Sequence, residues 1–265
     1  MNSTVTPSEE SPDLHLVLPG RSTPAGSGWT WLTGGWNLFM RAPLMWIISL
    51  VLVFVCFVAL ALVPILGQIV GNVLQPVILA GWMIACRSLE RGGDFELDHL
   101  LGGFKKNFGD LLVVGLLFLV GEVVIFLFFA AYLVFTVGTA FLMGSPDQML
   151  TALAAAGVTI LLGLLIALLF LVPLVAAYWF APVLVVMHDM KPIEAMKASF
   201  FACITNFIPM LVYGILMIPL FFLAAIPFGL GLLVAIPMTI ASIYVSYREI
   251  FTEEMAPVVA KPTFA

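Results

Sequence analysis

Glu122 is the residue whose position most strongly indicates chemistry. It lies in an apolar segment that begins after Asp110 and continues to about Val137. About twelve residues of helix, or roughly 18 Å, separate it from the start of that segment, near the middle of a bilayer. An ionisable side chain at that depth costs about 2.5–3.5 kcal/mol on insertion scales. The position predicts either a proton, cation or polar-substrate site, or a protonated glutamic acid that fixes helix packing by hydrogen bonds.

Polar side chains that could complete such a site occur in other apolar segments. Asn72 and Gln75 lie in the segment 69–86, and we expect them to face neighbouring helices rather than lipid. Thr239 and Ser242 lie in the last apolar segment and are further partners for Glu122. We therefore predict a candidate intramembrane polar site of Glu122, Asn72 and Gln75.

No residue pattern typical of an enzyme or a cofactor site is present. The sequence contains no HExxH, GxSxG, P-loop or dinucleotide-binding motif. Cys56, Cys86 and Cys203 show no CxxC spacing, which favours buried free thiols over a disulfide or a metal site. We predict no catalytic residues, no cofactor and no metal.

Two adjacent pairs of aspartate and histidine leave one alternative open. Asp98-His99 and His188-Asp189 both lie in gaps between apolar segments on the same predicted side of the membrane. A site shared by the two pairs is conceivable, but such pairs at helix ends usually face water.

The composition identifies the solvent around these residues. Of the 265 residues, 63% are hydrophobic and 9% charged, the net charge is −5 and the mean hydropathy is +1.17. A soluble domain carries roughly 25% charged and about 45–50% apolar residues. The composition therefore excludes a soluble globular protein and predicts an all-α polytopic membrane protein.

The apolar runs predict about six transmembrane helices. Their approximate ranges are 44–63, 69–86, 111–137, a long region from Pro146 to His188, 207–224 and 230–247. The last two are joined by a turn at Pro227-Phe228-Gly229.

The long region begins with the helix-start pattern Ser145-Pro146-Asp147-Gln148. One straight helix from there to His188 would be roughly 64 Å long, about twice the bilayer core. It must break, kink or project, and Gly163, Pro173 and Pro182 are the candidate places. Eight spans would result if this region folded into more pieces.

The cations predict the orientation. All ten Lys and Arg residues lie in the N-terminal tail, after the second span, after the fourth span or after the sixth. The three opposite turns contain none. By the positive-inside rule this predicts that both termini lie in the cytoplasm.

Three gaps on the cytoplasmic side show helical spacing of apolar residues and predict amphipathic helices in the membrane interface. The apolar positions are Trp29, Leu32, Trp36 and Phe39; Leu97, Leu100, Leu101, Phe104 and Phe108; and Ile193, Met196, Phe200, Ile204 and Phe207. Cations on and beside these helices are candidate lipid headgroup contacts: Arg87, Arg91, Lys105, Lys106, Lys191, Lys197 and Arg248.

Each amphipathic helix is followed by two spans, which predicts an internal repeat. Pro76 precedes Arg87 by the same number of residues as Pro237 precedes Arg248, and Pro182 occupies the matching place between them. We predict a flexible cytoplasmic tail over 1–27, repeat units over 28–92, 93–190 and 191–250, and a cytoplasmic tail over 251–265. Within the first tail, the short run Leu14 to Leu18 could lie against an apolar surface.

Several segments resemble a family of proteobacterial multi-span inner-membrane proteins of unknown function. The resemblance lies in Trp29-Thr30-Trp31 with Gly35-Trp36, in the stretch from Trp179 to Pro209, and in the ending from Tyr244 to Phe251. More distantly, the proline-containing spans resemble the membrane domain of some glycerophosphodiester phosphodiesterases, without their catalytic domain. The resemblance implies a multi-span inner-membrane protein and brings no catalytic residues.

Three hypotheses about function follow. We favour a non-enzymatic protein that organises membrane lipids or partner proteins, with possible self-association and no nucleic-acid partner. The alternative is a small transporter or channel that uses Glu122. An enzyme acting on lipid is the weakest, because no catalytic set is visible.

Overall fold

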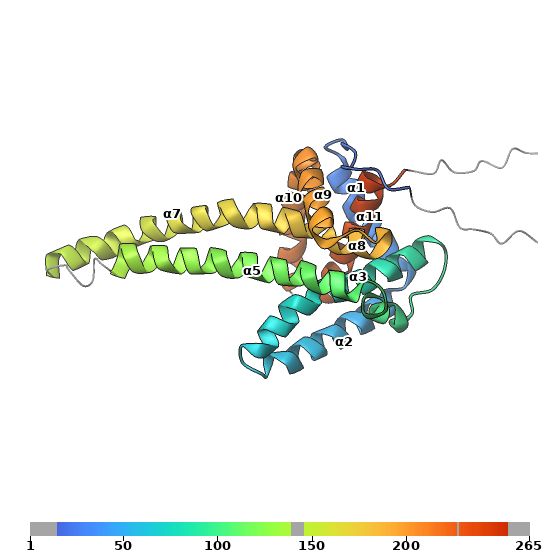
Figure 1. Cartoon of the computed structure of the whole chain (residues 1–265), viewed down its shortest axis with the longest axis horizontal. Helices are drawn as coiled ribbons and strands as arrows, with labels where there is room; N and C mark the ends of the chain where they lie inside the picture. Colours follow the sequence, from blue (N-terminus) through green and yellow to red (C-terminus); the bar gives the residue numbers. More distant parts are fainter. Residues whose placement is uncertain (1–14, 139–145, 227, 254–265) are drawn as a thin grey trace, which may run out of the picture.

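The computed structural model describes residues 15–138, 146–226 and 228–253, and they fold almost entirely as helices (Figure 1). The helices are α1 Ser27–Arg41, α2 Pro43–Ala61, α3 Leu66–Glu90, the 3-10 helix η1 Leu97–Leu101, α4 Gly102–Lys105, α5 Phe108–Leu133, the π-helix η2 Val134–Gly138, α7 Pro146–Trp179, α8 Ala181–His188, α9 Pro192–Thr205, α10 Phe207–Ala225 and α11 Leu232–Phe251. The fold class is all-α, as predicted.

Five stretches of helix in the described part of the chain are long and apolar enough to cross a membrane. They are Pro43–Ala61, Leu66–Glu90, Phe108–Thr136, Gly157–His188 and Phe207–Ala225. These correspond to the first five predicted spans, and the expectation of a polytopic membrane protein is confirmed.

The sixth predicted span, α11, is not among those five stretches. It contains Thr239, Ser242 and Ser246, and its last turn carries Arg248 and Glu249. About half of its side chains are buried against other helices. Helix α11 begins beside Ala224 at the end of α10 and ends beside residues 17–21, which precede α1. A helix that protein shields from lipid needs less hydropathy, so α11 returns through the bundle without being strongly apolar.

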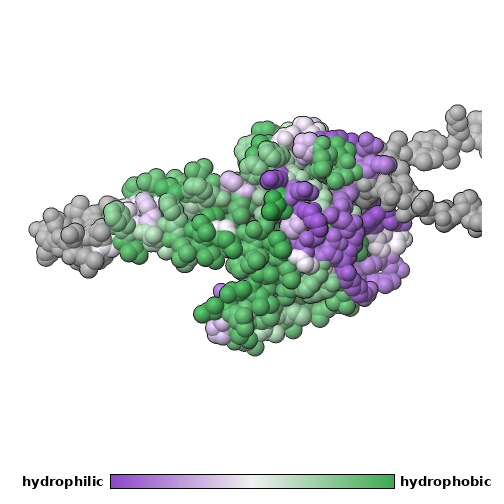
Figure 2. Space-filling model, in the orientation of Figure 1, coloured by the Kyte–Doolittle hydropathy of each residue, from purple (hydrophilic) through white to green (hydrophobic). Residues whose placement is uncertain are grey.

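The outer faces of the spanning helices are apolar and exposed. Phe54 of α2, Phe126 of α5 and Phe222 of α10 are 65, 66 and 70% exposed. Lipid tails are as apolar as these side chains, so their exposure carries no penalty in a membrane. Hydrophilic residues gather at one end of the visible face, where Figure 1 labels α1, α8 and α11 (Figure 2). We call this the polar end. Both described chain ends lie there, but the membrane side that it faces stays a prediction.

Short helices pack against long ones around the bundle. Helix α1 packs most extensively against α11, η1 and α4 pack against α3, and α9 packs against α7 and α8. Contact between α1 and α11 therefore joins the first part of the chain to the last. The order of a short helix followed by two long ones occurs three times, as the predicted repeat requires, but whether the units superpose remains a prediction.

Glycines allow these close contacts. A Cβ on Gly35 of α1 would lie 2.6 Å from the backbone oxygen of Met238 in α11. A Cβ on Gly115 of α5 would lie 2.4 Å from the backbone oxygen of Val73 in α3. Only hydrogen fits at such positions, which is the usual role of small residues between membrane helices.

Residues 16–23 are attached to the folded bundle, so the prediction of a flexible tail over 1–27 is wrong for this part. The backbone N–H groups of Val17 and Arg21 donate to the oxygens of Phe251 and Ile250, both at 2.8 Å. Leu16 forms an isolated β-bridge with Thr252 and packs against the core. The expectation that residues 14–18 lie against an apolar surface is confirmed for Leu16. Thr252 likewise belongs to this contact rather than to a free C-terminal tail.

The predicted amphipathic helices differ from the structure in two of three places. In α1, Leu32 and Phe39 are buried, but Trp29 and Trp36 are exposed, because Trp31 and Leu38 complete the face that packs on α11. The second predicted helix is broken into η1 and α4, and α5 begins only after Asn107, whose φ is +57°. The third forms as α9, with Ile193 and Ile204 exposed.

The long fourth region breaks once in its described part, at Phe180. Pro182 lies in the first turn of the following helix α8, where proline is tolerated, whereas Pro173 stays inside α7. Helix α7 has 34 residues and is roughly 51 Å long. It lies beside α5, and the two project together beyond the other helices (Figure 1). The expected N-cap Ser145 and the turn residue Pro227 lie outside the described residues.

We expect Gly35→Ala to destabilise the protein by about 1–3 kcal/mol, because the added methyl group forces α1 away from α11. The measurement is the midpoint of thermal unfolding in detergent. Gly109→Ala is the matched control, since a Cβ there meets nothing within 4 Å. Equal midpoints for both variants would contradict the close packing of α1 on α11.

Candidate functional site

Glu122 lies on α5, half-buried, beside α7. On the neighbouring helix α7, Tyr178 lies at the contact with α5. The Tyr178 hydroxyl is buried and has no hydrogen-bond partner among the described residues. The Tyr178 ring packs on Phe118, one turn before Glu122, with 4.4 Å between the ring centroids. Glu122 therefore faces the contact between α5 and α7.

Asn72 and Gln75 lie elsewhere, on α3 facing α2. Both line a cavity of about 240 Å³ that Phe57 and Ala61 close on the α2 side. Asn72 Nδ2 donates to the backbone oxygen of Gln68 at 3.2 Å. No hydrogen bond in the described part of the chain joins either residue to Glu122.

The other partners suggested for Glu122 are also engaged elsewhere. Thr239 donates to the backbone oxygen of Ala235 at 2.7 Å, one turn back on α11. The Ser242 hydroxyl is hydrogen-bonded to the Tyr213 hydroxyl of α10 at 2.5 Å. The structure therefore places Glu122 near one polar side chain, Tyr178, that the sequence did not suggest.

Most of the predicted headgroup cations are bound to other protein groups. Lys105 pairs with Asp98 at 2.6 Å, Lys106 with Asp189 at 3.5 Å, Lys191 with Asp110 at 3.5 Å and Arg248 with Glu90 at 2.9 Å; the Arg87 guanidinium lies 3.7 Å from the sulfur of Met187. Lys197 and Arg91 are exposed, and no ion pair with another described residue holds either of them. These two cations are the freest to meet a lipid headgroup.

The pairs Asp98-His99 and His188-Asp189 do not form a shared site. His99 Nδ1 accepts a hydrogen bond from the backbone N–H of Glu96 at 3.1 Å, within its own helix start. His188 Nε2 is instead hydrogen-bonded to the Tyr247 hydroxyl of α11 at 2.7 Å. Each histidine therefore has a separate structural partner.

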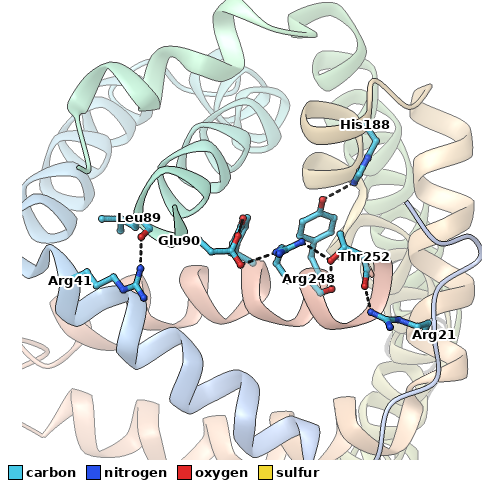
Figure 3. A network of polar contacts seen from close by, with 9 residues as sticks. Arg21, Arg41, Leu89, Glu90, His188, Arg248 and Thr252 are labelled. Atoms are coloured by element: carbon cyan, nitrogen blue, oxygen red, sulfur yellow. Dashed lines mark hydrogen bonds and ion pairs between the residues drawn. The ribbon is translucent and has the colours of Figure 1, made fainter. Parts of the chain in front are cut away.

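A network at the polar end connects the ends of α3 and α11 (Figure 3). Glu90 Oε1 accepts from Arg248 Nε at 2.9 Å, and Glu90 Oε2 accepts from the Tyr244 hydroxyl at 2.6 Å. Arg248 Nη1 donates to Thr252 Oγ1 at 2.7 Å. A carboxylate that accepts from both a guanidinium and a phenol is held by charge-assisted bonds, roughly twice as strong as neutral ones.

Further bonds attach the N-terminal part to the same network. Arg21 donates to the backbone oxygen of Thr252, and Arg41 donates to that of Leu89 (Figure 3). Glu249 accepts from the Ser27 hydroxyl at 2.7 Å and from the Trp31 indole N–H at 2.6 Å. The sequence did not indicate Glu90 or Glu249 as important. The only local pattern that marks these two residues is an acidic side chain next to the arginines at the end of an apolar helix.

A polar cavity of about 560 Å³ lies beside this network. Its charged lining residues are Arg21, Arg248, Glu90 and Glu249, so the two signs are balanced. Arg248 and both acids have partners within the network, and the Nε of Arg21 is buried without one. The cavity therefore has no net charge of its own to select an ion.

The largest of the described cavities is an apolar groove of about 690 Å³, which we call the α7–α10 groove. It is lined by Val172, Pro173, Val175, Ala176 and Trp179 of α7, Phe200, Cys203 and Ile204 of α9, Phe207, Met210, Leu211, Tyr213, Gly214, Met217 and Phe221 of α10, and Thr239 of α11. Burial raises the pKa of the Cys203 thiol to about 12, so it stays protonated and acts as an apolar lining group.

The chain is 31% identical over 250 residues to a protein of Burkholderia thailandensis named a probable inner membrane protein. The match covers 86% of this chain and 92% of that protein. No family model and no solved structure matches the chain. The more distant resemblance to the membrane domain of glycerophosphodiester phosphodiesterases is therefore without support.

We expect Glu90→Gln and Arg248→Met each to lower stability by about 1–3 kcal/mol, because each leaves a charged partner half-buried and unpaired. The double variant should be less destabilised than the sum of the two. Thermal unfolding of the four proteins measures the coupling. Strictly additive effects would contradict a direct interaction between the two side chains.

Proposed function

Because the chain belongs to the family of this inner-membrane protein of Burkholderia thailandensis, we propose that it is a non-enzymatic inner-membrane protein that organises lipids. The observation that carries the proposal is the α7–α10 groove, an apolar cavity of about 690 Å³ between helices long enough to span the membrane. Ligand sites typically have volumes of about 300–1,000 Å³ and mostly apolar walls.

The polar end supports a rigid scaffold. Ion pairs connect Lys106 to Asp189 and Lys191 to Asp110, so the start of α5 contacts the connection between α8 and α9. The network around Glu90 and Arg248 fixes α3 to α11. Helix ends that are joined in this way support a scaffold that holds a lipid. They argue against a transporter that opens alternately to the two sides of the membrane.

We expect the protein to carry a lipid population that differs from the surrounding membrane. The test is extraction with a polymer that keeps native lipid, followed by identification of the co-purified lipids and proteins. An unrelated multi-span protein from the same membrane is the control. A lipid composition equal to that of the control, with no enriched partner protein, would contradict the proposal.

A transporter or channel is the second candidate function, and Glu122 favours it. This carboxyl group lies within a spanning helix and has no hydrogen bond or ion pair to another described residue. It lies one helical turn after Phe118, which packs on Tyr178, and the Tyr178 hydroxyl is buried without a partner among the described residues. An unpaired acid inside a membrane is a functional hypothesis by default.

If the scaffold proposal is right, vesicles containing the wild-type protein should show the same proton leak as vesicles containing Glu122→Gln. The glutamine keeps the shape of a protonated acid but cannot release a proton. A pH-sensitive dye inside the vesicles measures the leak after an external pH jump. A flux that only the wild-type protein supports would favour the transporter and contradict the scaffold.

A further inference from the structure

We propose that the α7–α10 groove binds one acyl chain of an anionic glycerophospholipid and that Lys197 binds its phosphate. This inference rests on the proposed function and names the lipid class and the site.

The groove opens toward lipid. Helices α7 and α10 do not pack extensively against each other, and α9 contacts both of them. Ile204, Phe207 and Leu211 line the groove and are 55, 59 and 48% exposed. A void among apolar side chains loses dispersion contacts, and the bilayer supplies acyl chains rather than water to restore them.

The length of the groove suits one chain. Its lining on α10 extends from Phe207 to Phe221, a rise of roughly 21 Å along the helix. One leaflet of the hydrocarbon core is roughly 15 Å thick, so an acyl chain that starts at the interface can remain in the groove through its leaflet.

The polar lining groups on α11 and α9 leave the groove apolar. Thr239 and Cys203 are already hydrogen-bonded to backbone oxygens, at 2.7 and 3.5 Å.

Lys197 provides the charge. It lies on α9 one turn before Phe200 and two turns before Ile204, so the three share one helix face, and the two apolar residues line the groove. Lys197 is exposed and has no ion pair to another described residue, whereas the nearby Lys191 pairs with Asp110. Trp179, also in the lining, is typical of the membrane interface.

Gly214 allows a direct test, because it lines the groove and a Cβ built on it meets nothing within 4 Å. Gly214→Trp should fill the groove without disturbing the helices. Gly157→Trp is the matched control, since Gly157 lies in α7, outside the groove lining, and its Cβ also meets nothing within 4 Å. Gly214→Leu is the smaller variant if the tryptophan prevents folding.

The experiment uses the full chain reconstituted in vesicles of equal parts phosphatidylglycerol and phosphatidylcholine. After mild detergent extraction, native mass spectrometry counts the lipids that each variant retains. We expect the wild-type protein and Gly157→Trp to retain one phosphatidylglycerol, and Gly214→Trp to lose it. Lys197→Gln should reduce the preference for phosphatidylglycerol about fivefold, the effect of one interfacial cation. Glu194→Gln, at an exposed position on the same helix, should not reduce it.

The outcomes separate this inference from the proposed function. Selective lipid retention that is equal in the wild-type protein and Gly214→Trp would overturn the groove site and leave the scaffold proposal standing. No selective lipid on the wild-type protein would overturn both. Loss of a dimer in Gly214→Trp, with lipid retention unchanged, would assign the groove to a second copy of this chain and also overturn the inference. An unaltered lipid preference in Lys197→Gln would overturn the role of that residue.

Discussion

The close approach of α1 to α11 is the contact on which the closed arrangement of the bundle depends. Gly35 lets the two backbones come nearer than any side chain would allow. Gly28 does the same between α1 and α10, where a Cβ would lie 2.6 Å from the backbone oxygen of Pro209. Once α1 lies in this position, Trp31 and Phe39 are buried, Glu249 gains two donors, and residues 16–23 reach the end of α11. Close packing, rather than the hydrophobic effect, stabilises this contact, because moving an apolar side chain out of lipid gains little free energy by itself.

The fold could be predicted from the sequence where the signal was local. Long apolar runs located the spanning helices to within a few residues, since the bilayer fixes their minimum length. The sequence did not reveal that Trp31, rather than Trp29, faces α11, because periodicity shows that a helix has an apolar face but not which neighbour covers it. The break after Lys105 was missed for another reason. It depends on a left-handed backbone at Asn107, a conformation that a helical pattern of apolar residues conceals.

The candidate site was harder to predict than the fold. Glu122 was found from its depth in an apolar segment, but its neighbour Tyr178 lies on a different helix. The Glu90–Arg248 pair joins residues 158 positions apart, so nothing in the spacing could have matched them. The α7–α10 groove had no signal at all, because its lining is as apolar as the outer faces of the spanning helices. In a membrane protein, charge marks the ends of helices, whereas cavities between apolar helices depend on packing alone.

The attachment of the N-terminal residues to the end of α11 has a consequence for biosynthesis. Arg21 and its acceptor on Thr252 are 231 positions apart, which is nearly the length of the described chain. Helix α1 is made well before α11, the helix on which it packs. Contacts of such high sequence separation form late and slowly. Helix α1 can therefore take its final position only after α11 has been synthesised.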